Sequence, residues 1–488
     1  MKNIALKYKI LPLLIFIIFS MKAQNEEDAL RYSNVFFGGT ARYMGVGGAF
    51  GALGADISVL NINPAGMARF KKSEISLTPN ISLTNANSTF GGNSTSSGKE
   101  KLNVGSFGLV GVTKRKPENN SKWAAVQLGF SYNRLADFNE RFQISGDNNY
   151  SMSHVFALRS NNYSPDQLSD ADPFYGELAY QTYITDFDTN TNSYQSRMNS
   201  QLINHDHDVT RRGRVGEYAL AMAGNYNQKL YIGASIGLPK VVFEETKQHT
   251  ELEVQDTSEF THGFTFNEYQ LTTGNGINGK IGLIYLPLKW LRFGVALHTG
   301  TYYNLNDYWN TSMSSVVSTN ESYNSSSING IYNYKLRTPS KLITSASIVI
   351  AKAALISVDY SRIDHSLSRL SPNTFYGDNY NFENENNAID SNYNITNNLQ
   401  VGAEIKLGKF YLLRAGFANF QSPNNENTLN RIAYSAGVGY RNKKYFIDLG
   451  CRYSFWKDNY YMYDPAIIEN SSTENSMLNI SVTVGMKW

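Results

Sequence analysis

The sequence has few of the residues that cross-link a large chain, and it lacks the basic pattern that binds nucleic acid. It contains one cysteine, Cys451, among 488 residues, so no disulfide can form within the chain. Charged residues make up 17%, and the formal net charge is only +3 at pH 7. Because no basic stripe with interleaved aromatics is present, we expect no nucleic-acid partner.

Long hydrophobic runs are also missing. The longest, Ile10–Phe19, is too short for a membrane-spanning helix, which needs about twenty apolar residues. It follows the basic stretch MKNIALKYK and precedes the small residue Ala23, an order typical of a secretory signal peptide. We therefore predict residues 1–23 as a signal peptide cleaved near Ala23, and a mature protein that has left the cytoplasm.

Aromatic residues and glycine are abundant instead. The chain has 33 tyrosines, 26 phenylalanines and 38 glycines, a mixture that favours many strands joined by polar loops. The mean hydropathy of −0.37 is compatible with a membrane location, because a barrel strand exposes only alternate residues to lipid.

Alternation of apolar and polar residues is clearest in the last ten residues. One face of this predicted strand is apolar, and it carries Ile480, Val482, Val484, Met486 and Trp488. The preceding strand repeats the pattern, with Leu449 and Cys451 on its apolar face. Trp488 would lie in an interfacial aromatic belt, and we expect the barrel-assembly machinery to bind this C-terminal strand.

About fourteen strands are predicted, and their connections alternate between short and long. The strands are expected near 73–84, 103–113, 122–133, 215–226, 229–246, 263–286, 289–304, 339–350, 353–363, 397–406, 409–420, 430–441, 444–457 and 477–488. The long polar loops are expected near 85–102, 134–214, 247–262, 305–338, 364–396, 421–429 and 458–476. Short turns at one end and long loops at the other are the organisation of an outer-membrane barrel, and a β-sandwich gives no reason for them. We therefore predict an all-β fold, a transmembrane antiparallel β-barrel in the outer membrane.

A barrel of about fourteen strands is too wide for its own side chains to fill. The glycine-rich, weakly charged stretch Gly38–Gly66 precedes the first strand, and such a segment is ordered only if something encloses it. We predict residues 24–72 as an N-terminal hatch, or plug, inside a barrel of residues 73–488. Charged residues of both signs are expected to face the lumen and hold the plug: Asp359, Glu404, Arg414, Asp448 and Arg452.

The predicted loop 134–214 is unusually long. It contains the capping-box pattern Ser164-Pro165-Asp166-Gln167, followed by several aromatic residues. A short helical lid over the outer mouth and a mobile surface insertion both remain open at this point.

Motifs that could carry chemistry are few. The pair of histidines in His205-Asp206-His207-Asp208 could bind a metal, but in a loop alternate residues point apart and no third ligand is evident nearby. The glycine pattern at 274–279 matches a dinucleotide fingerprint, yet it lies in a strand pattern with no helix following. Most of the seven histidines fall in or near predicted loops. We expect no metal, no cofactor and no enzymatic activity.

The N-terminal stretch resembles a known family. A glycine-rich segment with the motifs Gly39-Thr40-Ala41-Arg42 and Asn63-Pro64-Ala65-Gly66, placed directly before a barrel, is similar to the FadL/TodX family of outer-membrane channels for hydrophobic compounds. The resemblance is closest to versions from Bacteroidetes. It covers about residues 34–80 through the motifs and the rest through architecture.

The resemblance implies passive uptake of hydrophobic molecules such as long-chain fatty acids by a monomer in outer-membrane lipid. It implies a gating role for the hatch motif, which comprises Gly39, Thr40, Ala41, Asn63, Pro64, Ala65 and Gly66. Ligand would reach a pocket lined by barrel and hatch and then leave, often sideways through a gap in the wall. The candidate pocket residues, chosen by their chemistry, are Phe36, Phe37, Phe50, Leu53 and Leu60.

A second function remains open. Some relatives with this architecture serve the type IX secretion apparatus, where they hold exported proteins and do not move lipids. A binding scaffold for exported proteins is therefore the alternative to a channel.

Overall fold

The computed structural model describes residues 26–36, 38–114, 121–198, 202–254, 261–317, 321–424 and 430–488. The predicted signal peptide, residues 1–23, lies outside these ranges, as does Phe37. No helix among the described residues is long and apolar enough to cross a membrane.

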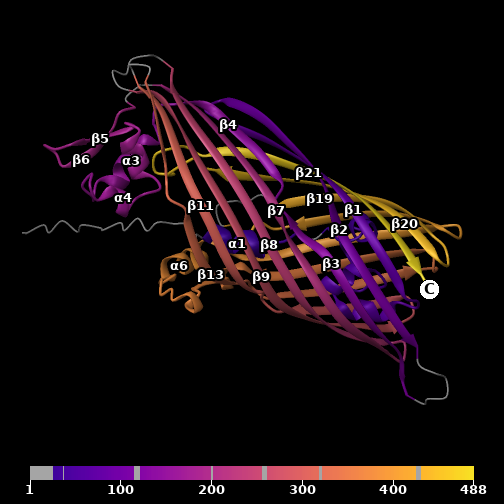
Figure 1. Ribbon diagram of the computed structural model, residues 1–488. Helices are drawn as coiled ribbons and strands as arrows, with labels where there is room; N and C mark the ends of the chain where they lie inside the picture. The colour runs from indigo at the N-terminus through magenta and orange to yellow at the C-terminus, as the bar shows by residue number, and fades with distance from the viewer. Residues whose placement is uncertain are drawn as a thin grey trace, which may run out of the picture.

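Fourteen antiparallel strands close into a barrel (Figure 1). Ten of them are single segments: β1 (Glu74–Phe90), β2 (Asn93–Lys114), β7 (Ile203–Tyr226), β8 (Leu230–Glu253), β9 (Thr261–Leu288), β17 (Ile395–Leu407), β18 (Tyr411–Phe420), β19 (Arg431–Arg441), β20 (Tyr445–Tyr460) and β21 (Ser471–Lys487). The other four each consist of two segments: β3 (Trp123–Asp137) with β4 (Glu140–Asn148), β10 (Leu291–His298) with β11 (Tyr302–Val317), β13 (Gly330–Arg337) with β14 (Lys341–Ile350), and β15 (Ala354–Asp364) with β16 (Arg369–Pro372). The ring closes because β21 pairs with β1.

The two ends of the barrel differ, and we call them the turn end and the loop end. At the turn end, the three-residue connections 227–229 and 351–353 each begin with two residues of positive φ, between 49° and 58°: Asn227 and Gln228 in the first, Ala351 and Lys352 in the second. Two consecutive positive φ angles fit the twist of adjoining antiparallel strands. The predicted short turns are therefore confirmed at these two hairpins.

The strands extend much further toward the loop end than the sequence pattern predicted. Residues 85–90 and 93–102, placed in a loop, belong to β1 and β2, and residues 134–137, 140–148 and 203–214 of the predicted long loop belong to β3, β4 and β7. The segment with His205 and His207 is also strand, so these alternate residues point to the same side, and both are buried. The loop assignments were wrong because beyond the lipid both faces of a strand can be polar, which removes the alternation on which they relied.

Apolar side chains cover the outer face near the turn end. The exposed residues there include Leu128, Leu220, Met222, Ile236, Ile281, Tyr411, Tyr434 and Ile447. The alternation predicted for the last two strands is confirmed, since Leu449 is exposed while its neighbours Asp448 and Gly450 are buried. An apolar outer band around a closed barrel indicates an outer-membrane protein.

A small lid lies at the loop end (Figure 1). It consists of α3 (Ser153–Ser160), α4 (Leu168–Ala171), α5 (Gly176–Gln181) and the hairpin β5 (Thr185–Asp188) with β6 (Ser193–Ser196). Its core residue Phe156 packs on Phe264 and Phe266 of β9, with ring centroids 6.2 and 5.3 Å apart. The helical lid is therefore confirmed, although α4 begins at Leu168, one residue after the predicted capping box.

Smaller elements complete the loop end. The strand β12 (Ser322–Ser326) pairs with β11 beyond the barrel wall. The 3-10 turns η3 (His365–Leu367) and η4 (Thr374–Tyr376) and the helix α6 (Glu383–Asn392) lie between β15 and β17.

Residues 26–36 and 38–72 lie inside the ring of strands, and we call them the N-terminal segment. They form α1 (Glu26–Ser33), α2 (Ala41–Gly45), η1 (Ile57–Asn61) and η2 (Pro64–Arg69). The helix α2 contacts β18 to β21, whereas η1 and η2 contact strands between β2 and β9, on other parts of the ring. Residues 39–72 are at the turn end, and α1 lies nearer the loop end (Figure 1).

Candidate functional site

The first of the two predicted hatch motifs begins α2. Thr40 is the N-cap residue: its Oγ1 accepts a hydrogen bond from the backbone N–H of Tyr43 at 3.1 Å and donates one to Asp56 at 2.9 Å. Gly39, directly before it, has φ of +62° and is covered by Tyr43 and Ser58. The motif therefore joins two turns of the N-terminal segment that are about sixteen residues apart.

The second motif begins η2. Asn63 is the N-cap residue, with its Oδ1 accepting from the N–H of Ala65 at 3.1 Å, and Pro64 occupies the first helical position. The Asn63 amide donates to the carbonyl of Gly51 at 2.7 Å. Gly66 is so close to Gly54 that an added Cβ would lie 3.0 Å from its Cα atom. Both motifs therefore have a structural role in compacting residues 39–72.

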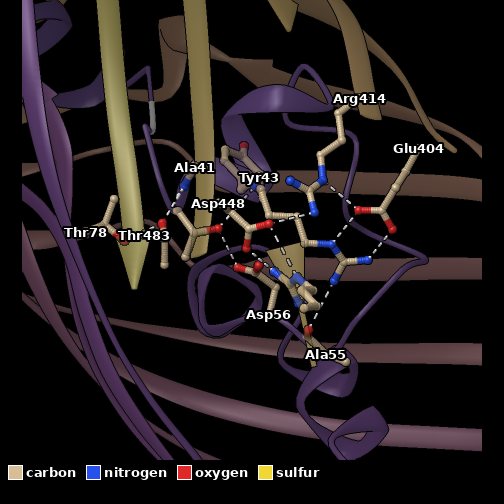
Figure 2. Close-up of polar contacts among 12 residues, drawn as sticks. Ala41, Tyr43, Ala55, Asp56, Thr78, Glu404, Arg414, Asp448 and Thr483 are labelled. Atoms are coloured by element: carbon tan, nitrogen blue, oxygen red, sulfur yellow. Dashed lines mark hydrogen bonds and ion pairs between the residues drawn. The ribbon is translucent and has the colours of Figure 1, made fainter. Parts of the chain in front are cut away.

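A buried ion-pair network fastens this compact unit to the barrel wall (Figure 2). Arg42 donates two hydrogen bonds to Glu404 of β17, at 2.8 and 2.9 Å. Arg414 donates to the same carboxylate at 2.7 Å and lies 2.8 Å from Asp448. Burial alone would lower the pKa of Arg42, but the Glu404 carboxylate outweighs it and raises that pKa above its ordinary value. The network therefore places charges of the N-terminal segment and of the wall in mutual contact.

Other lumen-facing polar groups bind the backbone of the N-terminal segment. Asp359 accepts hydrogen bonds from the N–H groups of Phe50 and Gly51, at 2.8 and 2.7 Å. Thr483 Oγ1 accepts from the N–H of Ala41 at 2.8 Å (Figure 2). The lumen-facing positions predicted for Asp359, Glu404, Arg414 and Asp448 are confirmed, and all four hold the segment directly or through a neighbour.

Glycines on the inner wall allow the segment to approach the strands closely. A Cβ added at Gly416 of β18 would lie 2.1 Å from the backbone nitrogen of Gly47. One added at Gly282 of β9 would lie 1.9 Å from Oδ1 of Asn63. These contacts, on separate parts of the ring, leave no space for larger side chains.

Three residues predicted to line a ligand pocket lie elsewhere. Phe50, Leu53 and Leu60 are 0%, 3% and 0% exposed, and they belong to a hydrophobic core shared by the N-terminal segment and the wall. Their position follows from their size, since large apolar side chains are what a compact unit buries first. The pocket prediction therefore fails for these three with respect to the cavity described next, which Phe36 borders.

A cavity of about 560 Å³ lies above this packed region, toward the loop end. Phe36, Gly39 and Met44 contribute to it from the N-terminal segment, and Phe420, Trp456 and Met477 are among its wall residues. Its charged lining residues are Glu27, Arg31, Arg134, Asp137, Glu140, Arg211, Arg431, Arg452 and Asp458. The cavity therefore combines aromatic surface with charges of both signs.

Arg431 differs in its partners from Arg211, another arginine of this cavity. Arg211 pairs with Glu140 at 2.7 Å, whereas Arg431 forms no ion pair with the residues that the structure describes. Its guanidinium lies over the rings of Trp456 and Phe36, 4.0 and 4.4 Å from their centroids. Arg431 is therefore a cation held by aromatic faces, and its charge is available to an anionic group.

The barrel wall is irregular beside the cavity. The register of β3 shifts between Arg134 and Ala136, and β4 continues along β7 without pairing with β2 in the described part of the chain. Side chains of the β1–β2 hairpin instead reach backbone carbonyls, as when Thr84 donates to Asn139 at 3.3 Å and Lys99 to Arg211 at 2.6 Å. Between β2 and β4, hydrogen bonds from side chains therefore take the place of the backbone ladder that is expected between neighbouring strands.

Known proteins resemble this chain in fold and not in sequence. No family model and no curated protein matches the chain. The solved structure of the toluene transporter TodX from Pseudomonas putida shares 12% identity with a TM-score of 0.54, over 92% of this chain and 98% of its own. This chain has the FadL/TodX-type fold. A FadL homologue from Pseudomonas aeruginosa shares 13% identity with a TM-score of 0.55, over 91% of this chain and 98% of its own.

Sequence reasoning missed part of the candidate site in this FadL/TodX-type barrel. Arg431 and Trp456 lie at strand ends near the loop end, where the alternation of apolar and polar residues fades. The available signal was the continuation of the inward-facing register, which Arg431 shares with Ala433 and Ser435. That register places Arg431 in the lumen once the facing of the strand is known.

Proposed function

We propose that this protein is a passive outer-membrane channel for hydrophobic molecules, with residues 24–72 as its hatch. The observation that carries the proposal is the position of the 560 Å³ cavity, between the packed turn end and the irregular wall at β2 and β4. A cavity of this size suits one small or medium-sized ligand. No catalytic step is part of the proposal.

The proposed path of the ligand follows from which parts of the lumen are filled by the N-terminal segment. Ligand enters from the loop end beside the lid and lodges in the cavity, because residues 39–72 fill the lumen below. Release then requires either movement of the hatch or passage through the wall at the register shift of β3, close to the point where its ladder with β2 ends. A path that leads directly into lipid spares an apolar molecule contact with water, which favours it energetically.

The lining supports an amphipathic ligand such as a long-chain fatty acid. Aromatic side chains contact the hydrocarbon, and the guanidinium of Arg431 pairs with the carboxylate. An uncharged aromatic compound would use the same apolar surface without engaging Arg431. Comparing the uptake of a fatty acid with the uptake of an uncharged aromatic compound therefore distinguishes the two substrate classes.

Uptake in cells that lack their own channel tests the proposal. Labelled oleate and labelled toluene are supplied to cells with the full-length protein, without it, or with Asn63→Ala, which removes the cap of η2 and the amide bond to Gly51. Uptake above the empty cells by the wild-type protein, altered by Asn63→Ala, supports a gated channel. A correctly assembled barrel that takes up neither compound overturns it.

The scaffold alternative has no separate observation in its favour. If uptake fails, co-purification of exported proteins with the intact barrel is the measurement that would support it. A monomer in outer-membrane lipid, assembled through the C-terminal strand that ends in Trp488, completes the proposal. The apolar outer band supplies the lipid contact.

A further inference from the structure

A cluster of histidines and one glutamate lies under the lid, apart from the cavity. His205 of β7 and His249 and Glu251 of β8 are 0%, 1% and 0% exposed. The outward-facing side chains of this part of β7 are polar: Asn204, Asp206, Asp208, Thr210 and Arg212. The cluster is therefore beyond the apolar band, on the outer side of the membrane.

The strand pairing explains how these residues meet. His205 stands directly opposite Glu251 in the β7–β8 ladder, and His207 stands opposite His249. Because side chains two residues apart share a face, all four point inward, toward the base of the lid. The interpretation of His205 and His207 as parts of a solvated loop with no third ligand was therefore wrong.

The donor atoms lie at separations suited to a metal ion. One donor from each of His205, His249 and Glu251 lies within 4.8 Å of the other two. Glu251 Oε1 is 2.9 Å from Nε2 of His249 and 3.4 Å from Nδ1 of His205. In a tetrahedral zinc site with bonds of about 2.0–2.1 Å, neighbouring donors are about 3.4 Å apart. Small side-chain movements therefore suffice to place the three donors around one ion.

His205 provides the observation that points to a ligand. Its side chain is fully buried, yet neither ring nitrogen makes a hydrogen bond with the residues that the structure describes. Burying a polar nitrogen without a partner is unfavourable, and native proteins rarely do so. A metal ion bound to Nδ1 would satisfy that nitrogen.

His249 is oriented as metal-binding histidines usually are. Its Nε2 faces Glu251, while its Nδ1 is 3.2 Å from Nδ1 of His207, whose Nε2 is 3.1 Å from the hydroxyl of Tyr460. Such outer partners fix the ring and its tautomer. His207 therefore stands where an outer partner of His249 is expected.

Glu251 also connects the cluster to the lid. Its carboxylate accepts hydrogen bonds from the N–H of Met152, at 2.7 Å, and from the hydroxyl of Ser151, directly before α3. Glu251 therefore joins the candidate metal site to the first residues of the lid.

We propose that His205, His249 and Glu251 bind one divalent transition-metal ion of the zinc class, which fastens the lid to β7 and β8. Two imidazoles and one carboxylate favour zinc over calcium or magnesium, which prefer all-oxygen sites. Three protein donors leave a fourth position for water. The site lies outside the ligand cavity, so it does not depend on the proposed channel function.

Metal titration of the full-length protein tests this site. The protein is purified in detergent without a polyhistidine tag, stripped with a chelator and titrated with Zn²⁺, and Co²⁺ is used to record the visible absorption of a tetrahedral site. We expect one ion per chain for the wild-type protein. His205→Gln and His249→Gln should each bind at least tenfold more weakly, while Ca²⁺ should not compete.

Two further variants serve as controls. His154→Gln changes a half-buried histidine of the lid whose Nδ1 contacts only the carbonyl of Ser151, at 3.2 Å, and it should bind zinc as the wild-type protein does. His207→Gln removes an outer partner, and its affinity should fall about tenfold or more without loss of the site. Zinc should also slow protease cleavage between α3 and β6 in the wild-type protein, and not in His205→Gln.

Each outcome decides the proposal. A stripped wild-type protein that binds no zinc, or binds it equally in the wild type and His205→Gln, overturns it. If the variants fail to assemble, as judged by the shift in gel mobility on heating, the wild-type titration decides alone. Stoichiometric binding with a tetrahedral cobalt spectrum then supports the site, and the absence of both overturns it.

Discussion

The two halves of the N-terminal segment meet the same barrel in different ways. Residues 39–72 contact strands around the ring through capped turns, buried ion pairs and close glycine contacts. Residues 26–38 pack more loosely: Asp28, Ala29 and Tyr32 of α1 are buried, while Glu27, Leu30 and Phe36 border the cavity. One half fills the lumen and the other leaves room in it.

The difference shows how one segment can fill part of a wide barrel and leave a cavity in another part. Where the wall offers glycine and paired charges, the segment packs as closely as a protein core. Where the wall bends at β3 and β4, the same segment lines a space of ligand size. In the proposed function, closing the lumen and binding the ligand belong to adjacent stretches of one chain, and variants can disturb one without the other.

The largest effect is expected from Glu404→Gln at the turn end. The change leaves Arg42 and Arg414 buried with their shared carboxylate removed, which costs about 3–5 kcal/mol when one partner of a buried ion pair is lost. Residues 39–72 should then loosen, and proteolysis of the N-terminal segment should accelerate sharply. The matched control is Glu469→Gln, an exposed residue of the loop end. Equal proteolysis in both variants would contradict the role of the network.

A smaller effect at the turn end is expected from Gly416→Ala. The added methyl group would lie 2.1 Å from the backbone of Gly47, so the segment must shift, at a cost of about 1–3 kcal/mol. Ion leakage through the assembled barrel, measured in planar bilayers, should appear. Gly111→Ala is the control, because its nearest heavy atom would be 3.9 Å away. Leakage in neither variant would show that the close contact is dispensable.

Arg431→Met examines the other half of the comparison. Removing the cation should reduce uptake of ionised fatty acid about tenfold, since a charge-assisted hydrogen bond contributes about 1.5–3 kcal/mol. Toluene uptake and ion conductance should not change. Arg362→Met removes an exposed arginine and serves as the control. A parallel loss of both compounds would instead indicate a general defect of the cavity.

The smallest effect is expected from Phe36→Ala. Its ring lies edge-on to Phe420 at 5.2 Å and beneath Arg431, and such aromatic contacts contribute about 0.5–1.5 kcal/mol. Uptake of both fatty acid and toluene should fall about fivefold, because the ring is apolar surface for either. Phe375→Ala, at an exposed ring on the outside of the barrel, should leave uptake unchanged. A change restricted to fatty acid would mean that Phe36 acts only by positioning Arg431.

Prediction from sequence worked where lipid imposes a rule and failed where it does not. Apolar and polar residues alternate along the strands that meet lipid, as at Leu449 and in the last strand. This alternation predicted which face of each strand points outward, and it placed Asp359 and Glu404 correctly in the lumen. Beyond the lipid the outer strand face is polar, so the strand around His205 lacked the usual pattern of apolar residues facing outward, and Arg431 was missed because the register of its strand was not followed to the end. The pocket residues failed for another reason: Phe50 and Leu60 are apolar because they are core, and composition alone cannot separate a core from a pocket.

The measurement that tests the central claim most directly is single-channel conductance in planar bilayers, with the intact mature protein and with a variant lacking residues 24–72. Assembly of both is checked first by the shift in gel mobility on heating. The account predicts that the intact barrel passes no steady ion current, and that the shortened barrel opens a water-filled pore with large conductance steps. A shortened barrel that assembles and stays closed would contradict the assignment of the N-terminal segment as the plug.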